Sequence, residues 1–189
     1  MTILILGVAL FTLLHLVPFY APTARASVIE KVGRGPYRGI FAVVALISVL
    51  LIVTGWRASE PGFVYAPPIW GVHATSLLVL FGFILFFSSR APTNIKRWVR
   101  HPQLTGLFLW ALGHLIANGE DRSLVLFGGF AVWSVLAIVG ANRRDGEWQK
   151  PEKQSIIKDV ITIVIGLVLY SAFVMIHEWL IGVSPMPMG

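Results

Sequence analysis

Six apolar stretches of about twenty residues each, separated by short polar loops, constrain the possible folds of this chain more than any other feature. They cover residues Thr2–Tyr20, Tyr37–Gly55, Trp70–Ser89, Pro102–Ala117, Ser123–Ala141 and Lys158–Ile181. About 20 residues at 1.5 Å per residue cross the ~30 Å hydrocarbon core of a bilayer. Backbone polar groups in lipid must be satisfied within their own segment, so such stretches form helices. The sequence therefore predicts an all-α integral membrane bundle of about six transmembrane helices.

Composition excludes several other classes of protein. Hydrophobic residues make up 56% of the chain and charged residues only 13%, against about 25% charged residues in soluble domains. The net charge is +6, but the basic residues lie between apolar stretches and not on one continuous face. We therefore expect a lipid bilayer and no nucleic acid as partner. The 189 residues allow one transmembrane domain over residues 1–189.

The chain contains no cysteine. Disulfides, thiolate metal sites and cysteine nucleophiles are therefore excluded. A possible signal-peptide cleavage site, Ala24-Arg25-Ala26, follows the first apolar stretch. No Lys or Arg precedes Arg25, so the basic region that opens a signal peptide is missing. We therefore expect Thr2–Tyr20 to be a retained span.

The basic residues predict the orientation. Thirteen of the fifteen Lys and Arg residues lie in the first, third and fifth loops: Arg25, Lys31, Arg34, Arg38, Arg90, Lys96, Arg97, Arg100, Arg143, Arg144, Lys150, Lys153 and Lys158. Short loops rich in Lys and Arg stay in the cytoplasm. Both termini are therefore expected on the non-cytoplasmic side, which requires an even number of spans.

Histidines within or beside the spans are the first candidates for function, because ionisable residues in lipid are costly. The five are His15, His73, His101, His114 and His177. For His73 and His177 we favour a structural hydrogen bond to a neighbouring helix. A neutral imidazole buried in a bundle is also a standard iron ligand, which makes His15 a candidate.

The fourth apolar stretch carries a regular stripe. Gly106, Trp110, His114 and Asn118 recur every four residues and share one helix face. This face could line a flat cofactor, or it could be a packing seam in which glycine allows close approach. His101 lies about 220° around the helix from His114, so one ligand site cannot easily use both.

Several motifs together resemble the NnrU family. They are His15-Leu16-Val17-Pro18, Gly35-Pro36-Tyr37-Arg38-Gly39, Arg100-His101-Pro102-Gln103-Leu104-Thr105-Gly106, Leu109-Trp110-Ala111-Leu112-Gly113-His114-Leu115-Ile116-Ala117-Asn118-Gly119 and Leu126-Phe127-Gly128-Gly129-Phe130. The most specific block is the one in the fourth apolar stretch. Proteins similar to NnrU are linked with denitrification and nitric oxide metabolism. The resemblance therefore implies a multi-pass protein of the bacterial cytoplasmic (inner) membrane.

The NnrU family is also related to plant 15-cis-zeta-carotene isomerase, a membrane enzyme that uses haem b. By motif, its two haem-ligating histidines correspond to His15 and His114 here, whereas Ala111 stands where the isomerase has a cysteine. The resemblance thus implies haem b between the first and fourth spans, with Trp110 and Asn118 beside it. His101 is the alternative ligand if the haem stands upright. The expected substrate is a small molecule such as nitric oxide, or an apolar polyene.

Two other functions stay open at this point. Arg100-His101-Pro102 also resembles a motif of membrane methyltransferases that bind S-adenosylmethionine, for which Glu147 or Glu152 would supply the later acidic residue. A non-enzymatic assembly factor for a respiratory complex is the third possibility. No catalytic residue can be named from the sequence.

Overall fold

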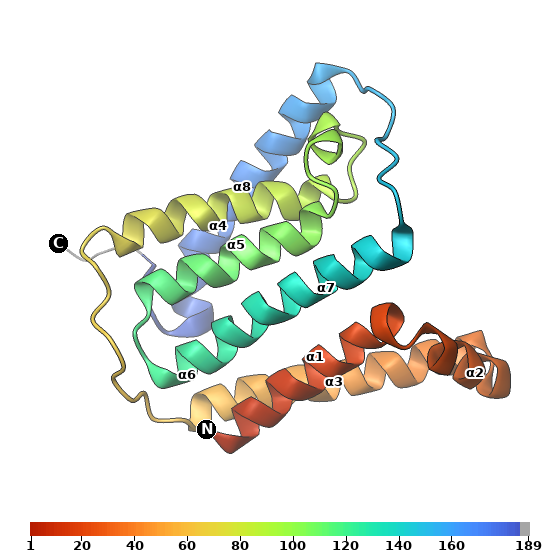
Figure 1. Ribbon diagram of the computed structural model, residues 1–189. Coiled ribbons are helices and arrows are strands. Elements are labelled where there is room, and N and C mark those ends of the chain that lie inside the picture. The colour runs from red at the N-terminus through yellow and green to blue at the C-terminus, as the bar shows by residue number, and fades with distance from the viewer. Residues whose placement is uncertain (186–189) are drawn as a thin grey trace. The chain divides into compact units, whose positions relative to one another are not determined.

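The computed structural model describes residues 1–185, which are all-α (Figure 1). The only strand-type pairing in this range is an isolated bridge between Phe63 and Glu120. The elements are α1 (Thr2–Tyr20), α2 (Pro22–Val32), α3 (Arg34–Ala58), α4 (Gly71–Ser88), the 3₁₀ helix η1 (Asn94–Arg97), α5 (Pro102–Ala117), α6 (Asp121–Ser123), the π-helical turn η2 (Leu124–Gly128), α7 (Gly129–Asp145) and α8 (Ile156–Ile181).

All six apolar stretches form helices, which confirms the predicted all-α membrane fold. Within residues 1–185, five helical segments are long and apolar enough to cross a membrane, with α6, η2 and α7 forming one of them. The sixth, α5, has 16 residues and spans only about 24 Å at 1.5 Å per residue. The side of the membrane on which each terminus lies remains a prediction.

Helix α2 was not expected, because the apolar pattern predicts only a loop over residues 21–36, between the first two spans. It has 11 residues, none of them buried, and Pro22 stands in its first turn. Proline suits that position, since the missing N–H has no partner within a helix anyway. Gly33 ends the helix with φ 87° and ψ 157°, a backbone conformation reserved almost entirely for glycine. A search for long apolar stretches cannot find such a short polar helix.

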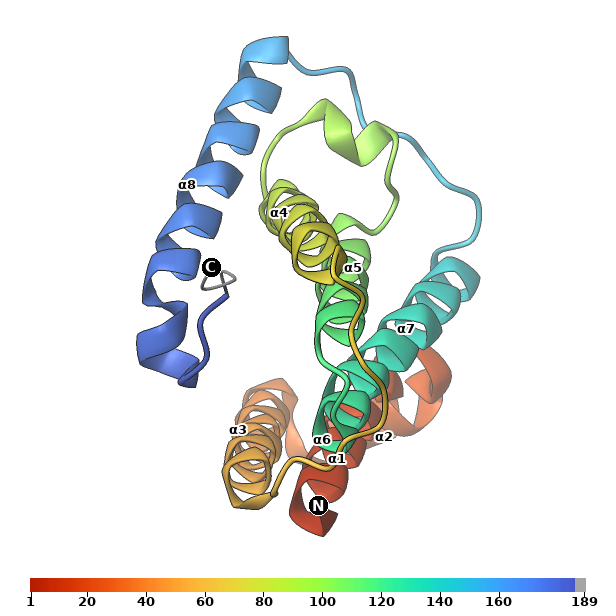
Figure 2. The ribbon, with the colours of Figure 1, turned by 90° about the vertical axis from the view of Figure 1, so that its left-hand side faces the viewer.

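The chain divides into two compact units. Unit 1 contains residues 1–65 and 119–146, where α1 packs against α3 and α7, and α2 packs against α1 and α3. Unit 2 contains residues 66–118 and the chain from residue 147 onward, where α4 packs against α5 and α8. Figure 2 shows α8 beside α4 within unit 2, with α4 seen nearly end-on and α8 crossing it.

Glycines bring helix backbones together in both units. A Cβ on Gly7 of α1 would lie 2.7 Å from the backbone nitrogen of Ile52 in α3, and one on Gly106 of α5 would lie 2.5 Å from the carbonyl oxygen of Gly82 in α4. Without a hydrophobic driving force between helices in lipid, such close van der Waals contact stabilises their association. The α4–α5 seam also has a hydrogen bond of 2.6 Å from the Thr75 hydroxyl to the Gly113 carbonyl.

In unit 1, charged residues join the start of α6 to the loop that follows α3. The Gly62 N–H donates to the Asp121 carboxylate at 2.9 Å. Arg122 pairs with Glu120 at 2.8 Å, and its guanidinium lies 4.5 Å from the centre of the Trp56 ring. These contacts tie α3 and α6 together at the end of unit 1 that carries few basic residues.

In unit 2, a carboxylate at the start of α8 anchors the 3₁₀ helix η1. Asp159 accepts hydrogen bonds from the Thr93 hydroxyl, from the Asn94 backbone N–H at 2.6 Å and from the Asn94 side-chain amide at 2.7 Å. Arg97 donates to the Pro151 carbonyl at 3.2 Å. The third and fifth loops, both rich in basic residues, therefore meet at the same end of unit 2.

Candidate functional site

His15 lies in an aromatic cluster of unit 1. Its ring stacks on Phe11 of the same helix at a centroid distance of 4.0 Å, and it makes edge contacts with Phe41 of α3 at 5.2 Å and with Trp133 of α7 at 6.0 Å. Trp133 is 7% exposed, and its indole N–H has no hydrogen-bond partner within residues 1–185. The imidazole is therefore held from three helices in apolar surroundings.

The hydrogen bond made by His15 determines its tautomer. Nδ1 lies 2.8 Å from the Phe11 carbonyl oxygen, which can only accept, so Nδ1 carries the proton and Nε2 the lone pair. Nε2 has no hydrogen-bond partner in the described part of the chain. Metal-ligating histidines commonly donate their other ring N–H to a backbone carbonyl in this way.

His114 on α5 has the same arrangement in unit 2. Its Nδ1 lies 2.8 Å from the Trp110 carbonyl oxygen, and the two rings are in contact with centroids 4.9 Å apart. Asn118 donates its side-chain amide to the His114 carbonyl at 2.7 Å. His177 of α8 is close enough for the two imidazoles to interact electrostatically. Trp110, His114 and Asn118 thus form one connected polar and aromatic row.

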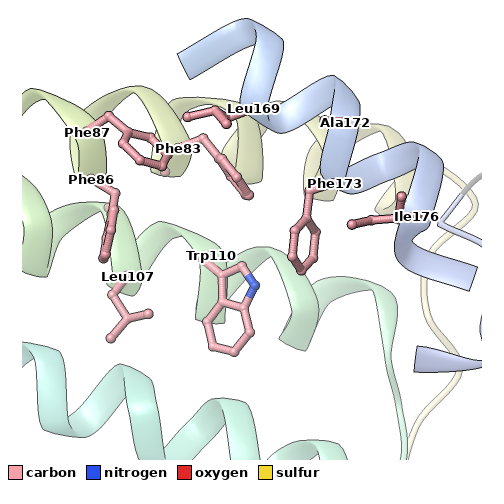
Figure 3. Close-up of a pocket in the computed structure, with 11 residues that line it drawn as sticks. Phe83, Phe86, Phe87, Leu107, Trp110, Leu169, Ala172, Phe173 and Ile176 are labelled. Carbon is pink, nitrogen blue, oxygen red and sulfur yellow. The ribbon is translucent and has the colours of Figure 1, made fainter. Parts of the chain in front are cut away.

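Beside this row is a cavity of about 460 Å³, which we call the aromatic pocket. Figure 3 shows the rings of Phe83, Trp110 and Phe173 around the same space. Helices α4, α5 and α8 supply its walls: Gly82, Phe83, Phe86, Phe87, Gly106, Leu107, Trp110, Leu169, Ala172, Phe173 and Ile176. Trp110 lines this pocket and contacts His114, which is not itself a lining residue and lies one helical turn further along α5.

The two interpretations of the α5 stripe apply to different positions along it. Gly106 lies against the α4 backbone and so belongs to the packing seam. Trp110, one turn further, belongs to the aromatic pocket. The close approach at Gly106 brings the α4 phenylalanines next to Trp110, so the seam shapes the pocket.

The other three histidines have different surroundings. His101 precedes the first residue of α5, and its carbonyl accepts from the Thr105 backbone N–H at 2.9 Å. That position lies about 20 Å along α5 from His114 at 1.5 Å per residue. His73 is exposed in the first turn of α4. His177 lies 2.8 Å through Nδ1 from the Val183 carbonyl.

The predicted ligand pair is divided between the two units, since His15 belongs to unit 1 and His114 to unit 2. Their joint ligation of one haem stays a prediction. No group of three or more His, Cys, Asp or Glu side chains suited to a metal ion occurs among residues 1–185. The acidic candidates for a methyltransferase, Glu147 and Glu152, are exposed in the segment between α7 and α8.

The aromatic pocket itself was missed by sequence reasoning. Its walls come from three helices, α4, α5 and α8. Which α8 side chains enter the wall depends on the face of α8 that meets α4, and sequence spacing does not give that face. One signal was present, since residues 81–87 hold four phenylalanines in seven positions. So many aromatic side chains on a short part of one lipid-embedded helix indicate a surface that could contact a ligand.

Comparison with known proteins gives a family for the chain. No curated protein and no solved structure matches it. The family described as NnrU protein matches residues 3–185, which is nearly the whole sequence. Both units fall within that match, together with His15, His114 and the residues of the aromatic pocket. The chain therefore belongs to the NnrU family.

Proposed function

We propose that this chain is a membrane haem b protein in which His114 would hold the iron and the aromatic pocket would receive the macrocycle. The observation that carries this proposal is the apolar cavity of about 460 Å³ next to His114, an imidazole whose Nδ1 is held by a backbone carbonyl. Cavities that bind small molecules and cofactors measure about 300–1,000 Å³ and are mostly apolar with a few polar groups.

The residues present fit this cofactor. The Trp110 carbonyl accepts from His114 Nδ1 and so fixes the tautomer in which Nε2, the nitrogen that would bind iron, carries no proton. The walls of Phe83, Phe86 and Phe173 would exclude water from a flat apolar ring. When bound, haem b would supply an iron that takes small ligands such as nitric oxide. The protein would orient the ligating imidazole and keep its surroundings dry.

His15 is proposed as a second residue that would hold the haem iron, as the family resemblance implies. Support comes from its own hydrogen bond, which leaves Nε2 with the lone pair, and from the apolar rings around it. Neither feature is needed by a histidine that only bonds a neighbouring helix. His101 remains the alternative second ligand.

A second candidate function is isomerisation of an apolar polyene. The observation that favours it is the lining of the aromatic pocket, which consists of apolar side chains and two glycines. Such a surface would accept a hydrocarbon chain as readily as a macrocycle. Binding of a polyene by the haem-loaded protein, detected as a shift of the polyene absorption, would separate this function from small-ligand binding alone.

The test is the visible spectrum of the full chain purified in mild detergent, oxidised and then reduced with dithionite. We expect a Soret band that His114→Ala removes or shifts, and a changed spectrum for His15→Ala. His73→Ala is the matched control, since His73 is exposed and lies in the same unit. Nitric oxide added to the reduced protein should shift the Soret band further, because it would displace one of the two histidines from the iron.

Two results would contradict the proposal. A featureless wild-type spectrum that persists after haem supplementation would exclude haem binding. A Soret band unchanged in His114→Ala would show that His114 is no ligand, even if haem is bound elsewhere.

A further inference from the structure

A second cavity lies in unit 1, at the end where basic residues gather. Its volume is about 230 Å³, and its lining residues are Pro18, Arg25, Tyr37, Arg38 and Phe41. We call it the arginine pocket. The lining thus combines two arginines and a tyrosine with a proline and a phenylalanine.

The chain reversal between α1 and α3 builds this pocket. Helix α2 packs against both α1 and α3, and Gly33, with its positive φ, turns the chain from α2 into α3. As a result, the Arg25 guanidinium of α2 lies 5.4 Å from the centre of the Tyr37 ring near the start of α3. A flexible loop would not hold Arg25 at this place.

The arginines of this pocket have no acidic partner within residues 1–185, and the one contact that their charges make there is that of Arg25 with the Tyr37 ring. Arg25 and Arg38 form no ion pair and no side-chain hydrogen bond with residues 1–185, and the Tyr37 hydroxyl likewise has no partner there. By contrast, Arg122 pairs with Glu120 and Arg144 pairs with Asp145. Two arginines that line one pocket without an acidic partner are suited to an external anion.

We infer that the arginine pocket binds the phosphoryl group of an anionic phospholipid. The planar guanidinium fork matches phosphate oxygens in two parallel hydrogen bonds, and the phenol can donate a third. Pro18 and Phe41, on the membrane-spanning helices α1 and α3, provide an apolar wall for the lipid backbone. The first loop is predicted to be cytoplasmic, and basic pockets between helices on that side take lipid headgroups.

The same chemistry could be met by free phosphate, so the test must distinguish the two sources. The full chain in neutral detergent would be titrated with phosphatidylglycerol or phosphatidylcholine, and bound lipid counted by native mass spectrometry. A parallel titration would use inorganic phosphate as competitor. We expect selective retention of phosphatidylglycerol that millimolar phosphate does not displace.

The decisive variant is the double substitution R25Q/R38Q, with K31Q/R34Q as its matched control. Both remove two positive charges from the same segment, but Lys31 and Arg34 do not line the arginine pocket. Loss of two charge-assisted hydrogen bonds should weaken phosphatidylglycerol binding by more than about 100-fold, whereas loss of two diffuse charges should weaken it by about thirtyfold at most. R25K/R38K keeps the charge but not the fork, and should lie between these values.

Equal loss in R25Q/R38Q and K31Q/R34Q would overturn the inference, because it would show general attraction to a basic surface. Equal binding of both lipids by the wild type would overturn it as well. Displacement by inorganic phosphate would assign the pocket to the free ion and reject the lipid. If R25Q/R38Q does not fold, Tyr37→Phe and Arg38→Gln alone test the same contacts, each with an expected loss of about tenfold.

Discussion

Replacing Gly106 by alanine would place a methyl group inside the seam between α4 and α5. The new Cβ would lie 2.5 Å from the Gly82 carbonyl oxygen and 3.0 Å from the Phe86 backbone nitrogen, where ordinary contact begins at 3.4 Å. Both neighbours are backbone atoms, so no side chain can rotate away and the helices must separate. Overpacking of this kind costs about 1–3 kcal/mol, offset in part by the 0.5–1 kcal/mol or so that alanine gains over glycine within a helix.

The net loss for Gly106→Ala is therefore about 1–2 kcal/mol, which for a chain of this size lowers Tm by about 3–6 °C. Thermal unfolding of the purified protein in detergent measures this loss. Gly39→Ala is the matched control, because a Cβ at Gly39 of α3 has nothing within 4 Å and should leave Tm unchanged or slightly raised. A Tm for Gly106→Ala equal to that of Gly39→Ala would refute the tight seam. Because Gly106 also lines the aromatic pocket, the variant should retain haem less well.

Two further predictions concern the loops. Asp159→Ala should destabilise the protein by about 1–2 kcal/mol, because three hydrogen bonds from Thr93 and Asn94 lose their charged acceptor. Thermal unfolding measures this loss. The control is Asp145→Ala, which removes the exposed ion pair with Arg144 and should change stability by less than about 0.5 kcal/mol. Since the chain has no cysteine, single cysteines report topology directly. Cysteines at positions 27 and 149 should react with a membrane-impermeant thiol reagent only from the cytoplasmic side and one at position 66 only from the opposite side, and the reverse pattern would invert the predicted orientation.

Much of the fold follows from the position and length of the apolar stretches alone. The predicted limits Thr2–Tyr20 and Pro102–Ala117 coincide with α1 and α5, since tyrosine, proline and charged residues mark these ends clearly. The helix of the second span begins earlier than predicted, at Arg34. Arg and Gly at the lipid interface do not end a helix, because its backbone hydrogen bonds can continue beyond the lipid into the aqueous region. Hydropathy marks the lipid-embedded part of a helix and not its hydrogen-bonded end.

The candidate site was less accessible from sequence. Spacing places Trp110, His114 and Asn118 on one face of α5, and the contacts among them agree with that face. Spacing cannot say that α8 contributes Phe173 and Ile176 opposite Trp110, because this depends on how α8 rotates against α4. Likewise, the arginine pocket depends on the turn at Gly33, and a single φ angle decides where Arg25 lies.

The two compact units are interleaved along the chain, and this has a consequence for biosynthesis. Helix α7, which completes the packing of α1 in unit 1, is translated only after the α4–α5 pair of unit 2, and α8 comes last of all. At about 5–20 residues per second, the α1–α3 pair waits roughly 4–16 s in the membrane for α7. Each early pair must therefore persist as an unfinished hairpin, held by its own glycine contacts, until its third helix leaves the ribosome.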